Sequence, residues 1–258
     1  MALAHGLKDY LGVARSLAIY RGRPSHARGL RRRYAGCVRP GDLVLDVGAH
    51  VGDRIAAFRA LGARVVALEP NDLLFRLLEA LHGRDPGVRL VKAAAGDRSG
   101  EATFRINRAN PTVSTLSQSF VEQARDADGW REQAWDAETS VRMVRLDEIV
   151  AGEGAPAFVK IDVEGFEAAA LSGLTHAPAA LSFEITTMAR AAGLEAFDRA
   201  AALGFDRFRF SEGESHGFSQ AAWVAAAEMR RHLAEMPATV NSGDVYCLSP
   251  AFDRPLPD

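Results

Sequence analysis

The chain has 258 residues, of which 48% are hydrophobic and 25% charged, and its formal net charge is −2. This length suits one α/β domain with additional segments, and the near-neutral charge excludes a global electrostatic footprint for nucleic acid. The two cysteines form neither a disulfide framework nor a metal-binding spacing, no apolar run approaches ~18 residues, and the first residues lack the order of a signal peptide, so we expect a cytoplasmic protein without a membrane span.

The first 36 residues are predicted to form a helical extension (1–36) ahead of a main domain at 37–258. Apolar residues recur at three- and four-residue spacing up to Ile19, and Pro24 interrupts the pattern before a second, basic helix. Arginines gather in the segment Arg28–Tyr34, which could contact phosphates or an acidic carrier. A solvated helix face is the commoner use of such a cluster, so we expect that role here.

From residue 43 onward, strand-like and helical patterns alternate. Strands are predicted at 43–47, 64–69, 88–93, 157–162, 180–185, 205–210 and 244–248. Helices are predicted between them, at about 51–61, 73–81, 166–174, 194–203 and 220–234. This alternation predicts an α/β fold with a doubly wound, mostly parallel sheet.

Residues 98–148 interrupt the alternation. Strand-like patterns at 102–106 and 140–146 flank a polar segment and a helical stretch that contains tryptophan. We expect a hairpin-like insertion beside the ligand-binding edge of the sheet, where substrate loops commonly lie. In its polar segment Asn110 and Ser114, with Thr115, are candidates for binding a hydroxylated substrate; a mobile polar loop is the alternative.

Three of the predicted strands end at a carboxylate, namely Asp46, Glu69 and Asp162. In open α/β sheets, ligands bind outside the carboxyl ends of the strands, so these acids point to a ligand site at that edge. Glu69 lies at the end of the second strand, roughly twenty residues after the glycine turn. An acid at this position can accept hydrogen bonds from both hydroxyls of a ribose. A solvated strand-end acid is the alternative interpretation.

A glycine turn follows the first strand. Gly48 and Gly52 permit a sharp turn into a helix and a close approach of the backbone to a ligand. The dinucleotide spacing G-x-G-x-x-G fails, because His50 and Asp53 hold its second and last glycine positions. Asp46 beside this turn suits a ligand with a positive ammonium or sulfonium centre better than a pyrophosphate.

Four segments carry a resemblance to a known family: Asp-Val-Gly-Ala-His-Val-Gly (46–52), Ala-Leu-Glu-Pro-Asn (67–71), Ala-Ala-Ala-Gly-Asp (93–97) and Phe-Val-Lys-Ile-Asp-Val-Glu-Gly-Phe-Glu (158–167). In order and spacing the chain resembles the FkbM family of S-adenosylmethionine-dependent methyltransferases over about residues 40–250. The resemblance implies a Rossmann-like class I methyltransferase fold, with a seven-stranded sheet whose last strand is antiparallel. It also implies O-methylation of a small molecule, often a hydroxyl of a sugar or a polyketide-type natural product.

The resemblance further implies a set of cofactor contacts, with S-adenosyl-L-methionine as the methyl donor and S-adenosyl-L-homocysteine as the product. The turn after the first strand would lie near the methionine part, Asp46 near its amino group and Glu69, followed by Pro70, at the ribose. Residues 94 and 97 would lie at the adenine, and His50 would point towards the cofactor or the substrate. The predicted cofactor-binding residues are Asp46, Gly48, Ala49, His50, Gly52, Glu69, Pro70, Ala94, Asp97 and Asp162.

The candidate catalytic residues are Asp162, Glu164 and Lys160, at the opening of the fourth strand of the sheet. O-methylation requires a hydroxyl to lose its proton, and a carboxylate in reach could act as general base. Proximity and orientation could instead supply most of the rate. Glu164 could also be a helix-start carboxylate that faces the helix dipole, and Lys160 alternates with Asp162, so the two are expected on one side of the strand.

Glu184 ends the fifth strand and is a candidate substrate contact, together with Asn110 and Ser114; a buried acid paired with an arginine is the alternative. No metal is expected, although nearby acids do not exclude Mg²⁺. The expected partner is a small-molecule hydroxyl acceptor, possibly glycosylated or carrier-bound, rather than nucleic acid or a membrane. The competing interpretations are a non-catalytic binding module and a nicotinamide-dependent oxidoreductase, which the failed glycine spacing disfavours.

Overall fold

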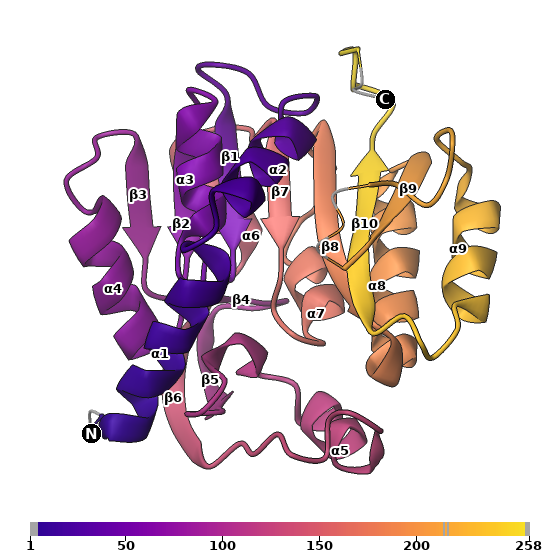
Figure 1. The fold of residues 1–258 in the computed structure, drawn as a ribbon. Helices are drawn as coiled ribbons and strands as arrows, with labels where there is room; N and C mark the ends of the chain where they lie inside the picture. Colours follow the sequence, from indigo (N-terminus) through magenta and orange to yellow (C-terminus); the bar gives the residue numbers. More distant parts are fainter. Residues whose placement is uncertain (1–4, 214, 216, 256–258) are drawn as a thin grey trace.

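The computed structural model describes residues 5–213, 215 and 217–255. At the centre lies a seven-stranded sheet in the order β3-β2-β1-β7-β8-β10-β9 (Figure 1). β10 runs antiparallel to both of its neighbours, and the other strands are parallel to one another, which confirms the predicted fold class. The strands are β1 (Leu43–Val47), β2 (Arg64–Leu68), β3 (Val88–Val91), β7 (Phe158–Ile161), β8 (Ala180–Thr186), β9 (Arg207–Glu212) and β10 (Ser242–Leu248).

Helices cover both faces of this sheet, so its inner strands are buried on both sides and read as nearly continuous apolar runs. In β1, Leu45 and Val47 join the core formed with α6, α7, α8 and α9, whereas Val44 joins the core formed with α2, α3 and α4. The helices are α2 (Pro24–Tyr34), α3 (Asp53–Ala60), α4 (Asp72–His82), α6 (Leu146–Glu153), α7 (Glu167–Ser172), α8 (Arg190–Leu203) and α9 (Ala226–Glu235).

The amino-terminal extension forms two helices that pack in different places. α2 packs on α3, where the Tyr34 ring lies 4.5 Å from the Phe58 ring, centroid to centroid. α1 (Leu7–Tyr20) instead crosses the front of the molecule towards the insertion (Figure 1). Gly12 allows this crossing, because a Cβ atom there would lie 2.4 Å from the carbonyl oxygen of Arg108.

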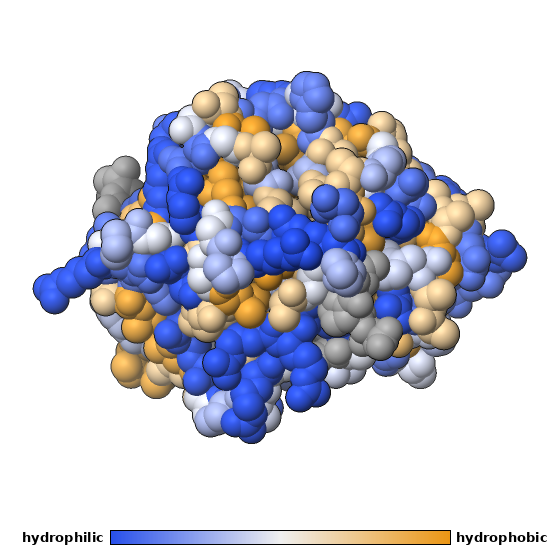
Figure 2. All heavy atoms as spheres, turned by 90° about the horizontal axis from the view of Figure 1, so that it is seen from above, coloured by the Kyte–Doolittle hydropathy of each residue, from blue (hydrophilic) through white to orange (hydrophobic). Residues whose placement is uncertain are grey.

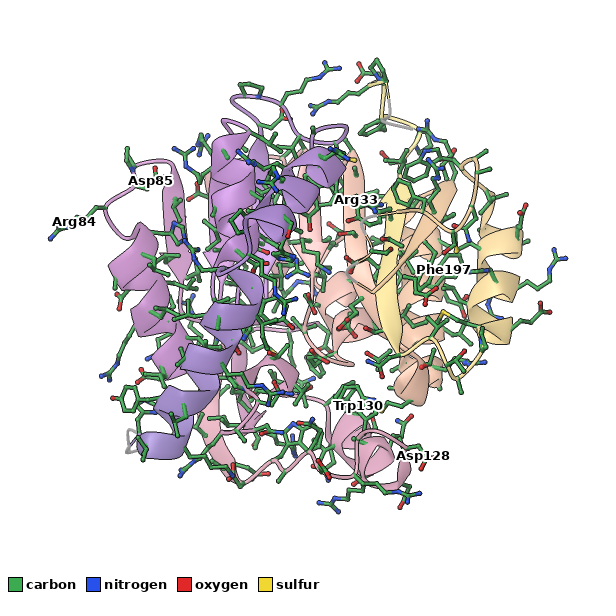
Figure 3. The ribbon with its side chains drawn as sticks, viewed as in Figure 1. Arg33, Arg84, Asp85, Asp128, Trp130 and Phe197 are labelled. Carbon is green, nitrogen blue, oxygen red and sulfur yellow. The ribbon has the colours of Figure 1, made fainter. Side chains whose placement is uncertain are left out.

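The arginine cluster of α2 divides between solvent and core. Arg28, Arg31 and Arg32 are exposed, as expected of a solvated helix face. Arg33 is buried; it donates a hydrogen bond to Ser211 Oγ, and its guanidinium lies 4.2 Å from the centroid of the Phe218 ring. Figure 3 shows Arg33 reaching from α2 towards β10. This arginine therefore fastens the extension to the end of the sheet that β9 and β10 form.

The insertion builds a second, three-stranded sheet in the order β4-β6-β5. β5 (Gly100–Ile106) and β6 (Ala137–Val144) pair antiparallel over their length, which confirms the hairpin-like insertion, and β4 (Ala94–Ala95) adds to β6. Between the long strands lie the short 3-10 helix η1 (Pro111–Val113) and α5 (Gln118–Asp126). Phe120 of α5 packs edge-on against Trp130 and Trp135, in a small core that the insertion shares with Ala189 after β8.

Several predicted boundaries differ from the structure, and two of them have a clear tertiary cause. The helix expected at 220–234 begins only at Ala226, because Val224 pairs with Phe208 of β9 and the Gln220 carbonyl accepts hydrogen bonds from Arg209. The strand expected at 88–93 ends at Val91, and the chain then joins the second sheet through β4. In both places tertiary pairing outweighs the local pattern.

At the opposite end of the molecule from the insertion, hydrophilic and apolar side chains are intermixed across the surface (Figure 2). Among the helices of the described residues, none combines the length and apolarity that crossing a bilayer requires.

Candidate active site

The turn after β1 lies against the end of β7. Gly48 has φ +84°, and a Cβ atom there would lie 1.9 Å from the carbonyl oxygen of Asp162, so this position requires glycine. Gly52 caps α3 with φ +74°, and a Cβ atom there would meet Leu78 at 2.8 Å. Gly52 thus serves the packing of α3 on α4, and the buried Ala49 belongs to the core that α2, α3 and α4 form on this face of the sheet.

Glu69 ties together the turns that follow β1 and β2. Its carboxylate oxygens accept hydrogen bonds from the backbone N–H groups of His50 and Asn71, both at 2.8 Å. The residue is only 4% exposed, so the alternative of a solvated strand-end acid is wrong. Burial raises the pKa of Glu69 to about 7, although both hydrogen bonds favour its charged form.

The first cavity, called here the cofactor cavity, lies at the carboxyl ends of β1 and β2. Its lining includes Gly48, His50, Glu69, Pro70, Leu74, Ala94, Phe104, Thr112, Ser114, Asp162, Glu164 and Phe166. The structure thus gathers most of the predicted cofactor residues around one space. Ser114, predicted to contact substrate, also lies here; its hydroxyl accepts a hydrogen bond from the backbone N–H of Asn107.

Asp97, which is expected near the adenine, does not line this cavity. It is exposed, and its carboxylate pairs with Arg98 at 3.3 Å. The physical reason is the turn into the second sheet: Ala94 and Ala95 pair with β6, and the chain after them turns outwards. Ala94 remains in the cavity wall.

Asp46 is fully buried, and neither of its carboxylate oxygens has a hydrogen-bond partner among the described residues. Burial raises its pKa to about 7. An unpartnered buried acid is costly, and it fits a ligand that brings a hydrogen-bond donor such as an ammonium group. The side chain is not part of the cavity lining described above.

Three carboxylates meet where β7 and β8 end: Asp162, Glu164 and Glu184 offer oxygens that lie within 4.8 Å of one another. Glu184 has no ion pair with an arginine among the residues that the structure describes, so the alternative of an Arg-paired acid does not hold. Burial and the neighbouring carboxylates raise the pKa of both Glu164 and Glu184 well above the usual value. Both shifts disfavour the charged form of these two side chains.

Cations keep the third acid ionised. Arg54 Nη2 lies 3.3 Å and Lys160 Nζ 3.4 Å from Asp162 Oδ2. Burial alone would raise the pKa of Asp162, but these two charges outweigh it and lower the pKa. Lys160 is fully buried beneath the site and also pairs with Asp244 at 2.5 Å. The positive charges of Arg54 and Lys160 thus already balance the charge of Asp162.

The turn after β7 holds Glu164 in an unusual conformation. Glu164 has φ +55°, which is uncommon for a residue with a side chain, and Thr115 Oγ1 donates to its carbonyl oxygen at 2.7 Å. Glu167 Oε1 accepts the N–H groups of Val163 and Gly165, at 3.0 and 3.2 Å. The helix-start interpretation of Glu164 is wrong, because α7 begins at Glu167 without a side-chain cap.

A second cavity of about 410 Å³, called here the acceptor cavity, opens between the insertion, α1 and the ends of β8 and β10. Its lining includes Arg15, Ser16, Ile19, Tyr20, Asn110, Thr112, Trp130, Gln133, Glu164, Glu184, Thr186 and Asn241. Trp130 lies between α5 and the central sheet (Figure 3), and its indole N–H donates to Asn241 Oδ1 at 3.0 Å. Thr112 and Glu164 line both cavities.

Many residues that line the acceptor cavity were not predicted from the sequence. Asn110 and Glu184 were predicted, whereas Trp130 was noted only as part of a helical stretch, and the α1 residues carried no functional signal. Lys160, predicted as catalytic, lines neither cavity and acts on Asp162 from below. His50 Nε2 lies 3.3 Å from Thr112 Oγ1, and burial lowers the pKa of His50 to about 4, so its ring is neutral.

Glu167 makes the stability of the fold depend on pH. Burial raises its pKa from 4.5 to about 7, so between these values the folded protein holds a proton that the unfolded chain has released. The free energy of unfolding should therefore fall as the pH rises from 5 to 8. The variant Glu167→Gln keeps the accepting oxygen without the charge, and we expect urea denaturation to show a shallower fall for it.

The exposed Glu235→Gln variant is the control. Its free energy of unfolding should fall with pH as steeply as that of the unmodified protein. Burial also raises the pKa values of Asp46 and Glu69, so the slope should be reduced rather than lost. An unchanged slope for Glu167→Gln would show that this carboxyl is ionised in the fold.

The central sheet, the glycine turn after β1 and the acids after β2 and β7 define a Rossmann-like fold with a cavity at the carboxyl ends of its strands. The methyltransferase FkbM domain family matches residues 46–237, and the chain belongs to this family. α1 and α2 precede the matched residues.

The known proteins to which the chain is similar include a curated relative and a solved structure. The hexuronic acid methyltransferase AglP of Haloferax volcanii is 29% identical over 147 residues, which cover 56% of this chain and 54% of that protein, so the match spans about half the length of the curated relative. The structure of a TehB-like SAM-dependent methyltransferase from Corynebacterium glutamicum superposes with a TM-score of 0.50 and 12% identity, covering 94% of this chain and 97% of that one. At this identity the second likeness concerns the fold alone.

Proposed function

We propose that this methyltransferase transfers a methyl group from S-adenosylmethionine to a hydroxyl of a saccharide or a related hydroxylated small molecule. The observation that carries the proposal is the junction of the two cavities, which Glu164 and Thr112 both line. A hydroxyl that enters from the acceptor cavity can there meet a methyl donor held in the cofactor cavity. Such positioning alone removes much of the entropic barrier to the reaction.

The residues of the cofactor cavity fit S-adenosylmethionine, which when bound supplies an electrophilic methyl group on a positively charged sulfur. Glu69 uses its oxygens to hold two turns and keeps lone pairs free for ribose hydroxyls. Leu74 and Phe166 offer apolar walls for the adenine ring. Asp46, whose carboxylate oxygens are buried without a hydrogen-bond partner among the described residues, fits an ammonium group.

Glu164 is the proposed general base. It lines the junction, and its raised pKa makes its ionised form a stronger base than an ordinary carboxylate. The acceptor hydroxyl gives its proton to Glu164 while its oxygen forms a bond to the methyl carbon and the carbon–sulfur bond breaks. Asp162 is a weaker candidate, because Lys160 and Arg54 stabilise its charge and so reduce its basicity.

The composition of the acceptor cavity supports a polyhydroxylated acceptor. Side-chain amides of Asn110, Gln133 and Asn241 and the hydroxyl of Thr186 can exchange hydrogen bonds with hydroxyl groups, and Trp130 offers an aromatic surface. The name of the Haloferax volcanii relative, a hexuronic acid methyltransferase, supports a saccharide.

Calorimetric titration with S-adenosylmethionine and S-adenosylhomocysteine tests the cofactor half of the proposal, with NAD and NADP as controls. We expect saturable binding of the first pair alone. Glu69→Gln should weaken this binding about 10- to 100-fold, because its amide places an N–H group against a backbone N–H and removes the charge.

Glu79→Gln, on the exposed side of α4, should bind the cofactor as the unmodified protein does. Thermal melting without ligand separates a binding effect from a loosened turn. Tight binding of NAD, or unchanged cofactor affinity of a folded Glu69→Gln variant, would contradict the assignment.

A further inference from the structure

α1 forms one wall of the acceptor cavity although it precedes the residues that match the family. Arg15, Ser16, Ile19 and Tyr20 of this helix all line the cavity. The helix packs against the turn after β1, where the Tyr20 ring lies edge-on to the His50 ring at 5.4 Å between centroids. Just after the helix, Arg21 donates to the carbonyl oxygen of Gly52 at 2.8 Å. The acceptor cavity is therefore incomplete without the amino-terminal extension.

Arg15 is the one cation among the described residues that line this cavity. No hydrogen bond or ion pair joins its guanidinium to another described residue, whereas Arg54 and Arg21 close by are engaged. Its side chain is exposed at the cavity wall. A guanidinium in this state keeps its planar set of donors free for a carboxylate or phosphate, which it binds in a bidentate manner.

Two acids, Glu164 and Glu184, line the far side of the cavity. Burial raises the pKa of each, helped by Glu184 and Asp162 in the case of Glu164 and by Asp162 in the case of Glu184, and so disfavours their charged forms. Asp162 lines the cofactor cavity and is balanced by Lys160 and Arg54. Arg15 therefore supplies the positive charge of the acceptor cavity, on the wall that α1 forms.

We propose that Arg15 selects acceptors that carry an anionic group, a carboxylate or a phosphate, on the saccharide to be methylated. The assignment rests on the proposed function and deepens it, since it names the charge class of the acceptor and the residue that recognises it. Charge-assisted, bidentate hydrogen bonding would orient the ring so that a hydroxyl faces Glu164. The recognition residue would then belong to a segment outside the common family region.

Three methyl glycosides test this assignment: the glucuronoside, the neutral glucoside and the glucoside 6-phosphate. Each is titrated by calorimetry into protein loaded with S-adenosylhomocysteine. We expect at least one anionic glycoside to bind about 10-fold or more tightly than the neutral one, and the preferred anion distinguishes carboxylate from phosphate. Arg15→Gln should abolish the preference, and Arg15→Lys should restore part of it.

Arg23→Gln is the matched control, since Arg23 is exposed nearby and lines neither cavity. It should retain the full preference. Equal binding of all three glycosides, no binding of any of them, or a preference that survives Arg15→Gln would each overturn the assignment, while normal binding of S-adenosylhomocysteine would leave the methyltransferase function intact. Failure to bind S-adenosylhomocysteine would instead overturn the proposed function, and the acceptor assignment with it.

Discussion

Replacing Glu164 with Gln is expected to lower the turnover number about 10²- to 10⁴-fold, the usual contribution of a general base. The substitution keeps the size of the side chain and a hydrogen-bonding oxygen but removes the ability to take a proton. Cofactor affinity should change little, because the amide can still occupy the junction of the cavities. In the unmodified enzyme, the rate should rise with pH as Glu164 ionises, since its pKa lies well above the usual value.

Glu184→Gln is the matched control for this experiment. Glu184 belongs to the same carboxylate cluster but lines only the acceptor cavity, so its loss should raise KM more than it lowers the turnover number. The measurement is the rate of S-adenosylhomocysteine production from pH 6 to 9, with an acceptor that the unmodified enzyme methylates. A Glu164→Gln enzyme with nearly normal turnover would show that proximity and orientation suffice.

Lys160→Met is expected to lower the free energy of unfolding by about 3–5 kcal/mol. Lys160 is fully buried, and its ammonium pairs with Asp162 and Asp244. Methionine fills a similar volume but leaves two mostly buried carboxylates without this counter-charge, which is the costly way to break a buried ion pair. Urea denaturation at neutral pH measures the loss.

The exposed pair of Lys8 and Asp136 provides the comparison, because both side chains are at least one-third open to solvent. Lys8→Met should change the free energy of unfolding by no more than about 1 kcal/mol. A similarly small effect of Lys160→Met would mean that Arg54 can neutralise Asp162 on its own.

The central sheet could be predicted because its strands are short apolar runs separated by amphipathic helices. The position of Asp46, Glu69 and Asp162 followed from the same pattern, since each lies at or directly after the end of a strand. The local sequence could not distinguish the roles of Glu164 and Glu167. Their difference depends on a left-handed backbone at Glu164, which Thr115 and Glu167 itself stabilise through hydrogen bonds.

Tertiary pairing accounts for the remaining differences between the sequence-based predictions and the structure. The motif around Asp97 suggested an adenine contact, but the pairing of β4 with β6 turns that residue outwards. The amphipathic pattern of α1 predicted a helix and gave no information about its partner. Its place at the acceptor cavity depends on the contact of Gly12 with Arg108, nearly a hundred residues away in the chain.

The insertion closes its own hydrogen-bond ladder, since β5 pairs with β6 rather than with the central sheet. Its sequence can therefore change without rebuilding the strands of the central sheet. Because Phe104, Thr112 and Ser114 line the cofactor cavity, changes at these positions would reach the donor side as well. Positions that line the acceptor cavity alone, such as Asn110 and Gln133, are where acceptor preference could diverge separately.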